Sequence, residues 1–181
     1  MLQPKQLLDI SGRPALRKCL EDILVSGIKD VIAVIRDRAG LLEAAGDLPV
    51  RFAFNNANES EMADSLRIGT GLSDEKATGI LICLCDHPFV KSETYAAIAR
   101  AHFSHPGSII MPRYRGRNGH PCLFPRAFLL KGLLPGRSLR DIVNENSSAI
   151  IRLETADEGV VMDIDTEEDY QSACLKKISS L

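Results

Sequence analysis

GILICLCDHPFV, residues 79–90, is the stretch that decides the fold class of this 181-residue chain. Six apolar or thiol residues, Ile80–Cys85, run without alternation and end at Asp86, which a histidine and a proline follow. A short continuous apolar run between a glycine and a proline is typical of a strand buried on both faces, as in a parallel sheet covered by helices. Ligands of such sheets bind beyond the carboxyl ends of the strands. We therefore predict that Asp86 binds a cation or another ligand.

Helical and extended patterns alternate on both sides of this stretch. The apolar spacing, caps and glycine stops predict helices over residues 14–26, 36–45, 61–72, 92–103, 125–132 and 138–144, and a last one after a Thr166–Asp169 capping box. Strands are predicted over 30–35, 50–54 and 108–111, and as a pair over 149–153 and 159–162, while 122–124 is a short apolar stretch after a basic loop. This alternation predicts a single α/β domain over residues 1–181, with three layers and a mostly parallel sheet.

The composition is that of an ordinary soluble globular protein, with 45% hydrophobic and 25% charged residues. A formal net charge of −2 gives no reason to expect nucleic acid or an anionic membrane as a partner. No apolar run approaches the roughly 18–20 residues that span a bilayer, and no signal-peptide pattern opens the chain. The five cysteines are an odd number, and we interpret them as small buried hydrophobes in a reducing cytoplasm.

Five short motifs follow one another along the chain: KQLLDISGRPALRKCLEDILVSGIKDVIAVI (5–35), NNANESEMADSLRIG (55–69), LCDHPFV (84–90), RGRNGHPCLFPRAF (115–128) and VVMDIDTEEDY (160–170). In this order they resemble the MobA-like nucleotidyltransferases, and within that family the branch of molybdenum cofactor cytidylyltransferases. The resemblance implies a Rossmann-like fold of the glycosyltransferase-A type. It also implies transfer of a nucleotide from an NTP, CTP being favoured, to a phosphorylated acceptor, with release of pyrophosphate and dependence on Mg²⁺.

The same resemblance implies roles for individual residues. Asp86 matches the metal-binding aspartate after the central strand, and Asp163 or Asp165 matches a second metal-binding position, for which we favour Asp163. Lys5 matches a lysine that contacts the NTP phosphates, and Ser65 matches a serine of the nucleotide-binding segment. The acceptor side, where a phosphorylated pterin would bind, corresponds to Gly119, His120 and Pro121. Mg²⁺ prefers such carboxylate oxygens, with phosphates and water completing its octahedron.

Each assigned residue also has a purely structural interpretation. Asp86 can cap the next turn or pair with an arginine. The remaining assigned residues can be ordinary surface, turn or helix residues. These are Lys5, Ser65, His120, Asp163 and Asp165. His87 stands where the family often has glutamine, and we interpret it as a neighbour of the site and not as a catalyst.

The start of the chain departs from the family. The family signature has the form LxAGxSxRMGxPK, whereas this chain opens at Met1 and has Leu2 where a glycine is usual. We therefore expect the first strand and the phosphate-binding glycine loop to be missing, neighbouring strands to lack a partner, and their free edges to favour self-association into a homo-oligomer. For this chain alone we expect poor or no turnover. Two alternatives stay open, a catalytically silent homologue that binds nucleotide or cofactor, and a nucleotidyltransferase that acts on a sugar phosphate.

Overall fold

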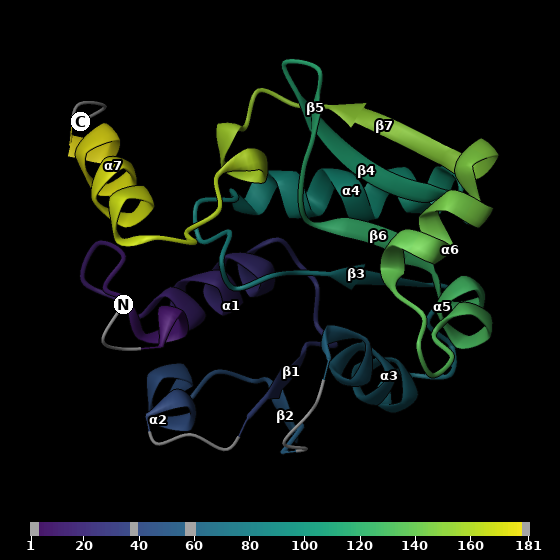
Figure 1. Ribbon diagram of the computed structural model, residues 1–181, viewed down its shortest axis with the longest axis horizontal. Coiled ribbons are helices and arrows are strands. Elements are labelled where there is room, and N and C mark those ends of the chain that lie inside the picture. Colours follow the sequence, from purple (N-terminus) through teal and green to yellow (C-terminus); the bar gives the residue numbers. More distant parts are fainter. Residues whose placement is uncertain (1–3, 37–39, 57–60, 179–181) are drawn as a thin grey trace.

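The computed structural model describes residues 4–36, 40–56 and 61–178, and Figure 1 shows how its elements are arranged. The helices are α1 (Ala15–Val25), α2 (Leu41–Ala45), α3 (Met62–Leu72), α4 (Ser92–Ser104), α5 (Arg126–Gly132), α6 (Leu139–Glu145) and α7 (Glu167–Ile178), with short 3-10 helices η1 (Lys5–Leu7), η2 (Ser147–Ala149) and η3 (Glu158–Val161). The strands are β1 (Ile32–Ile35), β2 (Arg51–Phe54), β3 (Gly79–Ile82), β4 (Ile109–Tyr114), β5 (Arg117–Asn118), β6 (Cys122–Pro125) and β7 (Ile150–Glu154). The chain therefore has the predicted mixed α/β architecture.

The strands form two separate sheets, which Figure 1 shows set apart from each other. β1 and β2 pair in parallel, with Ile32 opposite Arg51. The larger sheet has the order β3-β6-β4-β5, and β7 pairs in parallel with β4. The parallel pairs agree with the expected parallel sheet, whereas β6 runs antiparallel between β3 and β4.

β3 differs from the prediction of a strand buried on both faces inside a parallel sheet. It spans only Gly79–Ile82, pairs antiparallel with β6, and leaves Ile80 and Leu81 half-buried. Within residues 4–36, 40–56 and 61–178, no strand pairs with the second edge of β3 or of β1. The expected gap beside these strands therefore occurs in the described part of the chain, and it explains why the apolar run is less covered than predicted.

The predicted strand over residues 159–162 is wrong, because this segment forms the 3-10 helix η3. Its intended partner, β7, pairs with β4 instead, with Ile150 opposite Ile109. The physical reason is a close approach of two backbones. Gly159 lies so near the Phe89 carbonyl group and the Val90 nitrogen that an added Cβ would be 2.8 Å from that nitrogen. The Asp157 carboxylate accepts from the Gly159 N–H and closes the turn.

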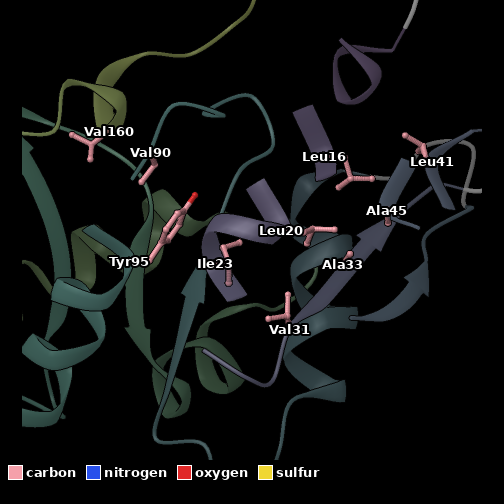
Figure 2. Packing of buried hydrophobic residues seen from close by; sticks show 10 residues of the cluster. All are labelled: Leu16, Leu20, Ile23, Val31, Ala33, Leu41, Ala45, Val90, Tyr95 and Val160. Carbon is pink, nitrogen blue, oxygen red and sulfur yellow. The ribbon is translucent and has the colours of Figure 1, made fainter. Parts of the chain in front are cut away.

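The largest core cluster joins α1 to elements on both sides of it, as Figure 2 shows. Its buried members are Leu16, Leu20, Ile23, Val31, Ala33, Leu41, Ala45, Val90, Tyr95 and Val160. Leu81 and Cys83 from the β3 side pack against the same cluster, so side chains hold the two sheets together where strand pairing does not. Among the described residues, no helix is long and apolar enough to cross a membrane.

The cysteines behave as predicted in the described part of the chain. Cys19 and Cys122 are buried free thiols, and burial raises the pKa of Cys122 to about 12. Cys83 and Cys85 are half-buried, and burial also raises the pKa of Cys83. Burial therefore keeps Cys83 and Cys122 protonated near neutral pH, and both pack as small apolar groups.

Replacing Asp157 with alanine should lower the free energy of unfolding by about 2–4 kcal/mol. The carboxylate is 5% exposed and accepts bonds from Lys91 N–H at 2.9 Å and from the Thr94 hydroxyl at 2.6 Å, so its loss leaves buried donors unpaired. Urea denaturation measures the change. The matched control is Asp47→Ala, whose side chain is 92% exposed and should cost less than about 1 kcal/mol. An equal effect of the two substitutions would contradict this role for Asp157.

Candidate functional site

A hollow of about 140 Å³ lies where η1 meets the segment that follows β3. Its lining residues are Lys5, Gln6, Leu84, Cys85 and Asp86. η1 is fixed there by the bond from Leu7 N–H to the Pro4 carbonyl and by packing against α1 and α2. The structure therefore brings Lys5 and Asp86, 81 positions apart in the sequence, to one surface depression, which we call the Lys5–Asp86 hollow.

Asp86 belongs to a turn that the backbone holds from two sides. His87 N–H donates to the Leu84 carbonyl at 3.2 Å, and the Asp86 carbonyl accepts from Ile164 N–H at 2.8 Å. Asp86 Oδ1 is buried and has no hydrogen-bond partner among the described residues, although His87 Nε2 lies 3.9 Å away. A buried carboxylate oxygen without a donor is the arrangement that a cation would complete.

Asp163 and Asp165 occupy different surroundings beside this turn. Asp165 Oδ1 accepts from Lys5 Nζ at 2.6 Å, with side-chain exposures of 61% and 39%. Asp163 is exposed. Burial lowers the pKa of His120, and the charge of Asp163 partly opposes this shift, so Asp163 lies on the histidine side of the site. The predicted capping box of the last helix is confirmed, because Thr166 and Asp169 exchange bonds at 2.8 and 3.1 Å. This cap fixes the segment that carries both aspartates.

His120 lies between β5 and β6, next to Gly119 and Pro121, and reaches the same region. The ring centroid of His120 is 5.1 Å from that of His87. The backbone N–H of His120 donates to the Val160 carbonyl at 2.8 Å. Burial lowers the pKa of His120, and the neighbouring His87 lowers it further, so the neutral imidazole is favoured near pH 7. The GHP segment and the Asp86 turn therefore form one polar cluster.

Ser65 lies apart from this cluster. It is on α3, and its hydroxyl accepts from Asn55 Nδ2 at 2.9 Å. It does not line the Lys5–Asp86 hollow, so its assignment to nucleotide binding stays a prediction. Part of its motif, residues 57–60, lies outside the described residues, as do Met1–Gln3 of the departing N-terminal signature.

The donor set fits a hard, hydrated cation. Within the described ranges, no three side chains of the His, Cys, Asp and Glu types converge on one metal position. Asp86 and Asp163 can supply one or two oxygens, and the other positions fall to water and substrate phosphates. This division of ligands is the usual one for Mg²⁺.

Sequence reasoning missed two neighbours of Asp86 and Lys5. Gln6 and Cys85 line the hollow, and Cys85 O is 4.0 Å from the Cys19 thiol on α1. Their positions directly next to Lys5 and Asp86 in the sequence could have suggested that they line the hollow. His87, interpreted as a neighbour of the site, lies with its ring centroid 5.1 Å from that of His120.

Comparison with known proteins identifies relatives over nearly the whole chain. The MobA-like NTP transferase domain matches residues 1–150. The structure of Rv0371c from Mycobacterium tuberculosis H37Rv is 26% identical with a TM-score of 0.81, covering 97% of this chain and 90% of that one. Its manganese complex is 24% identical with a TM-score of 0.73, covering 96% and 93%. CMP:2-keto-3-deoxy-manno-octonic acid synthetase complexed with CTP is 14% identical with a TM-score of 0.76, covering 98% and 92%. No curated protein sequence matches the chain.

Proposed function

Because the chain belongs to the MobA-like NTP transferase family, we propose that it transfers a nucleotide from an NTP to a phosphorylated acceptor and releases pyrophosphate. We propose CTP as the NTP and the molybdenum cofactor as the acceptor. The observation that carries this proposal is the Lys5–Asp86 hollow, where an ammonium group and a carboxylate without a donor lie together. The CTP complex of a structural neighbour supports the choice of nucleotide.

The residues divide the work of joining two anions. An acceptor phosphate oxygen attacks the α-phosphorus, a new P–O bond forms, and the bond to pyrophosphate breaks. Lys5 would leave Asp165 and place its ammonium on the triphosphate, which is a small change because the Lys5–Asp165 pair is solvent-exposed. Asp86 and Asp163 would hold Mg²⁺, which supplies charge neutralisation on the phosphates when bound. Gly119, His120 and Pro121 would contact the acceptor, and Ser65 the nucleotide.

The test is a substrate panel with the purified chain. Because the signature departs at Leu2, we expect pyrophosphate release by this chain to be slow, to depend on Mg²⁺ and CTP, and to occur only with the molybdenum cofactor. Lys5→Ala should lower this residual activity by about a further tenfold or more, because a charge-assisted phosphate contact is lost. Lys29→Ala, an exposed lysine outside the hollow, is the matched control and should keep full activity.

The panel also separates the alternatives. Robust release with a sugar phosphate, and none with the molybdenum cofactor, would replace the proposed acceptor. CTP binding in calorimetry without release for any acceptor would favour the catalytically silent homologue. In that case calorimetry measures the CTP affinity of the Lys5→Ala and Lys29→Ala variants, and only Lys5→Ala should bind CTP more weakly.

A further inference from the structure

Three buried polar atoms around Asp86 have no hydrogen-bond partner among the described residues. They are Asp86 Oδ1, His87 Nδ1 and His120 Nδ1. A buried polar atom without a partner costs about 1–3 kcal/mol, and native proteins contain few of them. Three such atoms on two neighbouring loops are explained if a bound group supplies the missing hydrogen bonds.

The two loops are held in place by the rest of the fold. The 3-10 helix η3 lies between them, with Gly159 against the Phe89–Val90 backbone and Val160 against Gly119. An added Cβ on Gly119 would be 2.9 Å from the Val160 Cβ, so this contact requires glycine. The His87 side chain is only 10% exposed. His87 is therefore buried, His120 is half-buried, and the loops that carry both are fixed by backbone contacts with η3.

The charges of this cluster favour a cation over an anion. Asp86 and Asp163 bring two carboxylates close enough to His120 to act on it electrostatically. The nearby ammonium of Lys5 is already neutralised by Asp165. A phosphate placed between the histidines would meet two negative charges, whereas a divalent cation would meet complementary ones.

We propose that His87 and His120 are positioning residues that hydrogen-bond the water molecules of a hydrated divalent cation bound at Asp86 and Asp163. The proposal rests on the proposed function, since it concerns the cation of that site. Mg²⁺ releases its waters reluctantly and keeps several of them in protein sites. Groups that orient such ligands from outside the coordination sphere tune metal affinity. The orphan Nδ1 atoms of the two imidazoles would provide this second layer.

The experiment measures Mn²⁺ binding by the electron paramagnetic resonance signal of free Mn²⁺, with and without CTP. His87→Phe and His120→Phe keep a ring but remove the hydrogen-bonding nitrogens, and we expect each to weaken Mn²⁺ binding by about 10–100-fold. His87→Gln restores a polar side chain and should recover most of the affinity. The matched control is His102→Phe, because His102 is also buried with an unpartnered Nδ1 but lies on α4.

A second measurement reports on the water itself. Bound Mn²⁺ increases the relaxation rate of water protons through its exchanging ligands, and we expect this rate per bound ion to change in His87→Phe and to return towards the wild-type value in His87→Gln. A purely structural role of the ring would not produce this pattern. Thermal melts check that each variant is folded.

The outcomes separate this inference from the proposed function. Unchanged Mn²⁺ affinity in both phenylalanine variants, with a loss in Asp86→Asn, would overturn the inference and leave the proposed function standing. Weaker Mn²⁺ binding in these variants, without turnover on any substrate of the panel, would support the inference and count against the proposed function. Weaker binding of inorganic phosphate with unchanged Mn²⁺ affinity would identify an anion site and overturn the inference. Absence of any Mn²⁺ binding by the wild type would overturn it as well.

Discussion

Asp86→Asn should abolish metal-dependent nucleotidyl transfer, lowering kcat/KM by at least about 100-fold, because a carboxylate that stabilises charge through a metal is worth several kcal/mol in the transition state. The amide is nearly the same size but is uncharged, and its nitrogen cannot bind a cation. Pyrophosphate release at a fixed Mg²⁺ concentration measures the loss. Mn²⁺ affinity, which does not depend on turnover, should fall in parallel.

The stability of this variant should change by less than about 1 kcal/mol, because Oδ1 accepts no hydrogen bond in the described structure and little is lost with its charge. Asp47→Asn, at a highly exposed carboxylate, is the matched control and should leave turnover, Mn²⁺ affinity and melting unchanged. Wild-type turnover in Asp86→Asn would remove Asp86 from the metal site.

Gly159→Ala should lower the free energy of unfolding by about 3–5 kcal/mol, the range of severe core substitutions. The added methyl group would overlap the Phe89 carbonyl and come within 2.8 Å of the Val90 nitrogen. Both are backbone atoms, so relief requires η3 to move away from the loop after Asp86. Urea denaturation measures the loss of stability.

Gly71→Ala is the matched control for this substitution. Gly71 lies on α3 with no atom within 4 Å of an added Cβ, so alanine should stabilise the chain by up to about 1 kcal/mol through helix propensity. Equal stability of Gly159→Ala and the wild type would show that η3 can shift freely, which would also weaken the argument that the histidine loops are fixed.

Local patterns predicted most helices because their signals lie within a few residues, although the helix predicted over 36–45 begins only at Leu41, after Gly40 in a left-handed conformation. The Thr166–Asp169 capping box, for example, needs only four consecutive positions. Strand partners are set by contacts between distant segments. A continuous apolar run does not distinguish a parallel from an antiparallel neighbour, so the pairing of β3 with β6 was not predictable from residues 79–85. Gly159 failed as a strand residue for the same reason, since its conformation depends on Phe89.

The sequence suggested which residues belong to the candidate site, but not how they are arranged. The order of the motifs proposed Lys5, Asp86, His120 and the two C-terminal aspartates, which lie near one turn, and Ser65, which lies apart from them on α3. Which aspartate pairs with Lys5 depends on the direction of the segment after η3, and the sequence carries no local signal for it. The ring contact between His87 and His120 also required the fold, because the two residues are 33 positions apart in the sequence.

The two separate sheets give the Lys5–Asp86 hollow a particular mechanical setting. η1, which carries Lys5, packs on α1 and α2 beside the β1–β2 pair, whereas Asp86 follows β3 of the larger sheet. No strand ladder in the described part of the chain joins these halves, so the distance between the ammonium and the carboxylate depends on side-chain packing and on single contacts such as the Lys5–Asp165 ion pair. A triphosphate that contacts both groups would tie the halves together. Binding of the triphosphate would then hold the two halves in one arrangement. By the same coupling, any change that fixes this arrangement in the free protein would raise the affinity for the triphosphate.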